Sequence, residues 1–222
     1  MNRPNWSRRD LLRRGVTAGV AIAVPGLAAA EQCELTPRQP SGPFYLKTHL
    51  RGAQFSNDLT SVKAGRPDGE VIRVEGRVRD RNCMPIPGAR IEIWQANAVG
   101  RYAHPRDPNP APLDPNFVGW GEAVTDENGL YTFTTIKPGA YHASASWTRP
   151  PHIHFRVQGK TAGLTTQMYF AGEAHNRTDG LLAAVPKAAQ RMLVIEPVRD
   201  GESGLENLFR FDLALSSGAT RA

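Results

Sequence analysis

Residues 71–78 read VIRVEGRV, in which apolar and polar side chains alternate. An alternation with a period of two is typical of a β-strand that buries one face. Residues 90–94, RIEIW, repeat the pattern, and Pro85, Pro87 and Gly88 lie between the two segments, where they favour a turn. These segments predict two strands joined by a turn.

Similar short segments with turn signals between them continue toward the C-terminus. The further predicted strands are residues 130–134, 152–157, 165–170, 192–195 and 209–213. Only residues 180–192 have a helical pattern, and Pro186 interrupts them. A β-sandwich or a barrel fits this succession. We expect an all-β fold with a β-sandwich core over residues 71–215, little helix, and an extended N-terminal arm over the proline-rich residues 31–70 that wraps the body.

Composition and charge exclude several classes of protein. The 222 residues include 21 Gly and 18 Pro without a repeating period, which favours short elements joined by turns. No apolar stretch of the body reaches the roughly 20 residues of a membrane span, so we expect none. Residues 1–30 hold five arginines and one aspartate and account for four of the six net positive charges. The nearly neutral remainder argues against binding of nucleic acid.

Residues 1–30 have the order of an export signal. Arg8-Arg9 precede a mildly apolar run over residues 15–27, and Ala28-Ala29-Ala30 offers a cleavage site. The segment resembles a twin-arginine signal peptide, with Leu11 where an aromatic residue is usual. This resemblance implies export of a folded, cofactor-bearing protein to the periplasm or another extracytoplasmic compartment. The alternative is the basic amphipathic start of a cytosolic protein.

The chain has two cysteines, Cys33 and Cys83. In an oxidising compartment such a pair can form one disulfide, which would join the arm to the body. Two separate buried thiols are the alternative, because spacing does not show proximity. The pair is too sparse for a thiolate metal site.

His152-Ile153-His154 lies in a predicted strand. Side chains two residues apart on a strand point to the same face, with Cα atoms about 6.6 Å apart, so both imidazoles could bind one ion. Imidazole suits Zn, Cu, Ni or Fe. A surface pair is the alternative. Ligation is favoured because the chain has no cysteine cluster, no His-Glu-x-x-His, no Walker loop and no Gly-x-Ser-x-Gly.

Eight segments together resemble the intradiol ring-cleavage dioxygenases, and most of all the protocatechuate 3,4-dioxygenase type. They are IWQAN (93–97), GRY (100–102), LDPNF (113–117), TDENG (125–129), IKPG (136–139), Tyr141, RPPHIHF (149–155) and QMYF (167–170). The similarity runs in order through about residues 85–171. The chain lacks the extra helical N-terminal segment of the catechol and hydroxyquinol branches, which favours the protocatechuate-like branch.

The resemblance implies a metal centre. By position, Tyr102, Tyr141, His152 and His154 would be the four protein ligands of one mononuclear non-haem Fe(III) per subunit, with solvent hydroxide as the fifth ligand. Phenolate is a hard, anionic oxygen donor that stabilises ferric iron, and two phenolates with hydroxide balance the 3+ charge.

The same resemblance implies a reaction and its residues. A catechol-type aromatic substrate would be opened between its two hydroxyls by O₂, giving a cis,cis-muconate-type diacid. Tyr141 would leave the iron and take up a substrate proton, Arg149 would stabilise the carbanion-like ring, and Gln167 would orient an oxygen near that arginine. Tyr45 is a candidate substrate-binding residue, beside Phe44, which takes a place often held by tyrosine. Family members often form oligomers, so we expect one, either of identical subunits or with a related chain.

Two functions of other classes are alternatives. A transthyretin-like β-sandwich binding module shares Pro138-Gly139-x-Tyr141, with the tyrosine as a packing residue, but gives no reason for the His pair or Arg149. A Zn-dependent hydrolase built on the His pair lacks a Glu or Asp base at a recognisable spacing. Residues 142–148 are about two residues shorter than in protocatechuate dioxygenases, which leaves the identity of the substrate open.

Overall fold

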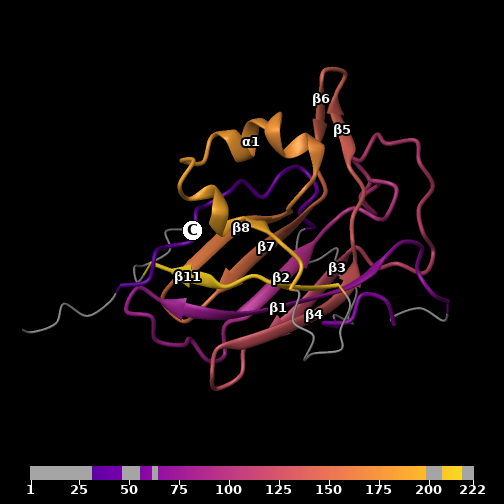
Figure 1. Cartoon of the computed structure of the whole chain (residues 1–222). Coiled ribbons are helices and arrows are strands. Elements are labelled where there is room, and N and C mark those ends of the chain that lie inside the picture. Colours follow the sequence, from indigo (N-terminus) through magenta and orange to yellow (C-terminus); the bar gives the residue numbers. More distant parts are fainter. Residues whose placement is uncertain (1–31, 47–55, 62–64, 199–206, 217–222) are drawn as a thin grey trace, which may run out of the picture. The chain divides into compact units, whose positions relative to one another are not determined.

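The structure is a computed structural model (Figure 1) and describes residues 32–46, 56–61, 65–198 and 207–216. The predicted export signal in residues 1–30 lies outside the described residues and stays a prediction. No helix in the described part has the length and apolar character that a bilayer crossing requires.

The strands of the described residues form two larger sheets and a hairpin. In the first sheet, β1 (Val71–Asp80) is antiparallel to β4 (Leu130–Ile136) and parallel to both β10 (Leu208–Arg210) and β11 (Leu213–Leu215). The second sheet has the order β3 (Trp120–Val124), β2 (Arg90–Trp94), β7 (His152–Gln158), β8 (Gly163–Phe170) and β9 (Val194–Ile195). The hairpin pairs β5 (Tyr141–Ser144) with β6 (Trp147–Arg149).

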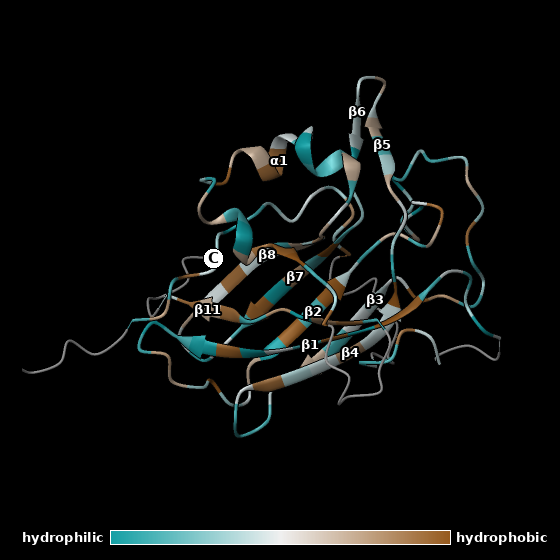
Figure 2. Ribbon diagram, in the orientation of Figure 1, coloured by the Kyte–Doolittle hydropathy of each residue, from teal (hydrophilic) through white to brown (hydrophobic). Residues whose placement is uncertain are grey.

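The two sheets pack face to face around an apolar core. Alternate residues of β1 are buried, as its sequence predicts. The ring of Phe133 on β4 lies 6.4 Å from that of Phe155 on β7, and Phe155 lies 5.0 Å from Phe211, so side chains of both sheets interleave. Figure 2 shows hydrophobic segments along β2, β7 and β8. The prediction of an all-β fold is confirmed.

Helix in the described residues is limited to three short elements. They are η3 (Ala174–Arg177), α1 (Gly180–Ala183) and η4 (Gln190–Met192). The predicted helical region over residues 180–192 therefore contains two short helices, and Pro186 lies between them.

The prediction of a single strand over residues 209–213 is wrong, because the pairing with β1 is interrupted between β10 and β11. The carbonyl of Phe211 accepts a hydrogen bond from the hydroxyl of Tyr131. The amide of Arg77 donates to the carboxylate of Asp212 at 2.8 Å, so a side chain replaces the backbone acceptor. Two hydrogen bonds that involve side chains thus divide the segment into β10 and β11.

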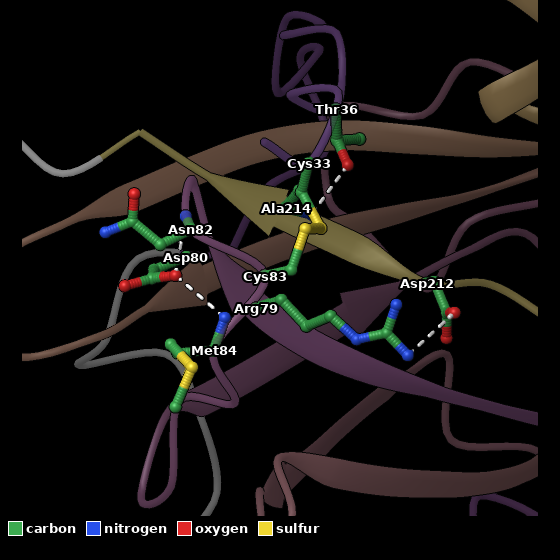
Figure 3. Close-up of a disulfide and its surroundings, with 9 residues drawn as sticks. All are labelled: Cys33, Thr36, Arg79, Asp80, Asn82, Cys83, Met84, Asp212 and Ala214. Atoms are coloured by element: carbon green, nitrogen blue, oxygen red, sulfur yellow. Dashed lines mark hydrogen bonds and ion pairs between the residues drawn. A yellow bond between two sulfur atoms is a disulfide. The ribbon is translucent and has the colours of Figure 1, made fainter. Parts of the chain in front are cut away.

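Residues 32–46, the described first part of the predicted arm, contain no helix or strand; they follow the edges of β11 and β8 and turn at Pro43–Phe44. The amide of Thr36 donates to the carbonyl of Ala214, and the amide of Gln39 donates to that of Thr165. Cys33 and Cys83 form a disulfide (Figure 3), so the alternative of two separate thiols is wrong. The arm is therefore fixed to the turn after β1 at its beginning and to both sheets further on.

Candidate active site

His152 and His154 lie on β7, which is hydrogen-bonded to β2 on one side and β8 on the other. Each residue is 2% exposed, and their ring centroids are 4.9 Å apart. Ile153 between them belongs to the apolar core, so the two imidazoles occupy the other face of the sheet. The pair is buried rather than on the surface.

The two predicted tyrosine ligands lie beside this pair. The hydroxyl of Tyr102 is 3.3 Å from Nε2 of His152, and its ring centroid is 6.4 Å from that of His154. The ring of Tyr141 lies 5.6 Å from that of Tyr102 and 5.7 Å from that of His152. The structure therefore brings together all four side chains that the sequence singled out as ligands.

A close backbone approach brings the two tyrosines together. Gly100 has a φ of +81°, and a Cβ at this position would lie 2.2 Å from the carbonyl oxygen of Ala140, so only glycine fits. The loop that ends at Tyr102 therefore packs directly against the chain that enters Tyr141. The amide of Tyr102 donates to Asp107 at 2.6 Å, which holds the loop in place.

Burial controls the protonation of these groups. It raises the pKa of Tyr102 well above the usual value and also raises that of Tyr141. Burial, reinforced by the nearby Arg149 charge, lowers the pKa of His152 well below its usual value, and burial likewise lowers that of His154. In the absence of a cation, the site thus holds two neutral phenols and two neutral imidazoles.

The hydrogen bonds of the two histidines suit metal binding. Nδ1 of His152 lies 2.7 Å from the carbonyl oxygen of Pro150, so Nδ1 carries the proton and the Nε2 lone pair faces Tyr102. His154 stacks on Trp94 at 4.8 Å, and its buried Nδ1 has no hydrogen-bond partner among the described residues. Two oxygen and two nitrogen donors in one buried site are a donor set for a transition-metal ion, which would also stabilise the phenolates.

Arg149, at the end of β6, lies beside the four side chains and is 3% exposed. Its Nε donates to Asp179 at 2.7 Å, and its Nη2 donates to Gln167 at 2.8 Å and to the hydroxyl of Tyr169 at 3.1 Å. Its Nη1 lies 3.2 Å from Nε2 of His152. The predicted Arg149 and Gln167 therefore touch each other, and Arg149 also touches His152. We call the four candidate ligands, Tyr102, Tyr141, His152 and His154, the ligand cluster.

Sequence reasoning missed Tyr169 and Asp179. Tyr169 follows Gln167 by two residues on β8, so strand alternation could have placed both on the same face. Asp179 precedes α1 and caps it, and that signal alone gave no link to Arg149.

The arm forms one wall of the site. The amide of Gln167 donates to the carbonyl of Pro40 at 3.0 Å, and the hydroxyl of Tyr169 donates to Gln39 at 2.9 Å. The ring of Phe44 lies 4.5 Å from that of Tyr102. Phe44 therefore packs on a candidate ligand.

Tyr45, the candidate substrate-binding residue, packs against the buried aromatic cluster that includes Trp94, Tyr102 and Tyr141. Its hydroxyl donates to Glu92 at 2.8 Å and accepts from Arg156 at 2.7 Å. Its ring packs against Trp94 and Trp120 at 4.8 and 5.1 Å. Tyr45 thus joins the arm to β2 and β7.

A cavity of about 170 Å³ adjoins the site. Its lining is mostly apolar and includes Phe44, Trp94, Tyr102, Phe117 and Trp120. A flat aromatic molecule suits such walls.

The family model described as Dioxygenase matches residues 41–217. The chain is 46% identical over 199 residues to the protocatechuate 3,4-dioxygenase beta chain of Burkholderia cepacia, a match that covers 80% of this chain and 84% of the relative. It is 31% identical over 159 residues to the catechol 1,2-dioxygenase of Acinetobacter baylyi, a match that covers 65% of this chain and 49% of the relative. The chain thus spans about half the length of that second relative.

Solved structures share the fold. The catechol 1,2-dioxygenase of an Acinetobacter species aligns with a TM-score of 0.62 at 29% identity, over 82% of this chain and 63% of that chain. An intradiol ring-cleavage dioxygenase from Tetranychus urticae aligns with a TM-score of 0.66 at 24% identity, over 85% and 98% of the two chains. The family match, the identity to the first relative and the assembled site lead to one conclusion: this chain belongs to the intradiol ring-cleavage dioxygenases.

Proposed function

We propose that the chain binds one Fe(III) through Tyr102, Tyr141, His152 and His154, and that it opens a catechol-type aromatic between its hydroxyls with O₂. The product would be a cis,cis-muconate-type diacid. One feature supports this proposal above all: two phenols and two imidazoles from separate segments meet in one buried site. Phenolates are hard anionic donors that favour the ferric ion over softer or less charged metals.

Among the described residues, no group of His, Cys, Asp and Glu alone offers three ligands for a metal. A metal site in this part of the chain therefore depends on tyrosine. This dependence favours ferric iron over the zinc of a hydrolase, because structural and catalytic zinc sites are built from His, Cys and carboxylates.

When bound, the ferric ion would supply the Lewis acid that holds the deprotonated substrate oxygens. Tyr141 is 9% exposed and Tyr102 is 3% exposed, so Tyr141 is the phenol nearer to solvent and the better candidate to move away from the metal position. Burial raises the pKa of Tyr141, so a Tyr141 phenolate that is not bound to the metal would be a strong base. Such a base is suited to accept a proton from a substrate hydroxyl. Tyr102 stays in place because Phe44 packs on its ring and Asp107 holds its amide.

Arg149 provides a fixed positive charge beside the proposed metal ligands. Its Nη1 faces the site through His152, where it would favour the carbanion-like form of the bound ring. Gln167 holds the guanidinium from β8 and is itself held by the arm at Pro40. The apolar cavity next to Tyr102 would exclude water from the ring during the reaction.

The relatives support a protocatechuate-like substrate and an assembly of related chains. Identity to the Burkholderia cepacia beta chain is 46%, whereas identity to the alpha chain of the same organism is 30% over 190 residues, covering 81% of this chain and 91% of the relative. We infer an oligomer, either of this chain alone or with an alpha-like partner. The arginine-rich start of the chain supports export by the twin-arginine route to the periplasm or another extracytoplasmic compartment.

The test is metal analysis and oxygen uptake of the purified protein. We expect one iron per chain, a red-brown colour from tyrosinate-to-iron charge transfer, and ring cleavage measured on protocatechuate, catechol and hydroxyquinol with identification of each product. A colourless protein with stoichiometric zinc would contradict the proposal. For export, replacing Arg8 and Arg9 by Lys should retain the protein in the cytoplasm, and unchanged export would contradict the twin-arginine assignment.

A further inference from the structure

We propose that Asp179 is a positioning residue that holds the Arg149 guanidinium with Nη1 directed at the ligand cluster. This inference rests on the proposed function, because the orientation of Arg149 affects the reaction only if the ligand cluster binds the metal and its substrate. Asp179 is fully buried, and its Oδ2 lies 2.7 Å from Nε of Arg149. The two side chains are 0% and 4% exposed, so they form a buried ion pair.

A count of donors shows what Asp179 contributes. A guanidinium has five N–H groups in one plane. Asp179 takes the single N–H of Nε, while Gln167 and Tyr169 take those of Nη2. The two N–H groups of Nη1 remain, and Nη1 lies 3.2 Å from Nε2 of His152. The Arg149 side chain also has a hydrogen bond with Tyr141, so it touches two members of the ligand cluster.

Metal binding would change the partner of Nη1. Nε2 of His152 has one lone pair, and a metal would occupy it. The N–H group of Nη1 that faces His152 would then be available to a substrate oxygen, while the other edge of the guanidinium stays bound to Asp179. Without Asp179, the planar group could rotate, and its charge would be buried without a carboxylate partner.

Asp179 also caps α1, since its Oδ1 accepts from the amide of Leu182 at 2.8 Å. Its two carboxylate oxygens thus serve two elements, α1 and β6. A purely structural role as helix cap is the alternative to positioning, and the two roles can be separated. Serine caps a helix about as well as aspartate but is too short and uncharged to pair with Arg149.

The test therefore uses Asp179→Ser and Asp179→Asn. The asparagine has one oxygen and cannot satisfy both Arg149 and Leu182. Glu75→Gln is the matched control, because it removes a carboxylate that pairs with Arg210 on the exposed face of β1, at 3.0 Å. The first readout is the NMR resonance of the Arg149 Nε–H in the metal-free protein, which is identified by its loss in Arg149→Lys. The second readout is kcat of the iron-loaded protein.

We expect slow hydrogen exchange of the Arg149 Nε–H in the wild type and in Glu75→Gln, and fast exchange in both Asp179 variants. We expect kcat to fall about 10–100-fold in the Asp179 variants, with iron content and resting colour unchanged. An unaltered resonance in Asp179→Ser, or a kcat within about twofold of wild type, would overturn the proposal. A wild type without ring-cleavage activity would refute the proposed function, whereas the resonance of the metal-free protein would still show whether Asp179 holds the guanidinium.

Discussion

Gly42 in the arm lies directly against His154, and its replacement by alanine tests the site through a single methyl group. A Cβ at Gly42 would lie 3.3 Å from Cε1 and 3.7 Å from Nε2 of the imidazole. Carbon atoms prefer separations of about 3.5–4.0 Å, so the ring must move by a few tenths of an ångström. Metal–ligand distances tolerate about 0.2 Å, and we therefore expect Gly42→Ala to lower iron affinity by about tenfold or more.

The backbone adds a separate cost to this substitution. Gly42 has a φ of +67°, a conformation that costs an alanine about 1–2 kcal/mol. For a chain of this size, 1 kcal/mol lowers Tm by about 2–4 °C. Gly172→Ala is the matched control, because Gly172 has a φ of +81° and no atom within 4 Å of its Cβ position.

Two measurements separate these effects. Thermal unfolding of the metal-free protein should show a similar loss of Tm in Gly42→Ala and Gly172→Ala. An iron titration followed by the charge-transfer absorbance should show weaker binding in Gly42→Ala alone. Iron binding by Gly42→Ala as tight as in the wild type, or an equal loss in Gly172→Ala, would refute the placement of the arm against His154.

Three further predictions concern the ligands and the disulfide. Tyr141→Phe removes an oxygen donor and a base, so we expect a shifted charge-transfer band and a loss of kcat beyond about 100-fold; an unaltered spectrum would remove Tyr141 from the site. Because burial lowers the pKa of His152 and His154, the unfolded chain alone takes up protons on these rings below about pH 6.5. As the pH is lowered below that value, the free energy of unfolding of the metal-free protein should fall by about 1.4 kcal/mol per pH unit for each ring. Urea titrations that show no such dependence would contradict the burial of the two histidines as neutral rings. Reduction of the Cys33–Cys83 disulfide, which joins residues 50 apart, should lower the free energy of unfolding by about 2–4 kcal/mol, measured by urea denaturation with and without reductant.

The sheets could be predicted where one face of a strand is buried. The alternation in β1 follows from that burial. The polar and apolar residues of β2 also alternate, and both strands were predicted correctly, although β2 is buried on both faces and Glu92 is only 2% exposed. The hairpin of β5 and β6 was missed, because three of the four residues of β5 are exposed and no apolar period marks them. Its pairing is nonetheless important, since it sets Tyr141 directly opposite Arg149.

The four candidate ligands of the site could be predicted from the sequence, whereas the residues around them could be predicted less well. His152 and His154 share a face because of strand alternation, which is a local property of the sequence. Asp179 lies 30 residues from Arg149, and no local pattern joins them. Phe44 lies in a turn after Gly42, whose φ is +67°, so no periodic pattern predicted that Phe44 packs on Tyr102 and Tyr45 on Trp94.

The alternatives weighed from the sequence differ in their outcome. The match over residues 41–217 excludes the non-catalytic transthyretin-like module, which shared the turn before Tyr141 and the strand pattern but gave no reason for the His pair or Arg149. The donor types support the proposal of ferric iron over zinc, and metal analysis tests it.

The disulfide lies at the beginning of the segment that carries Gly42 and Phe44 to the ligands. In a reducing compartment both thiols stay free, and the segment is then held mainly by hydrogen bonds and side-chain contacts. If the chain folds and takes up iron before export, as proposed, it does so without this covalent bond. Oxidation outside the cytoplasm would then crosslink a segment that already lies in place, so the covalent bond would secure this wall of the site rather than build it.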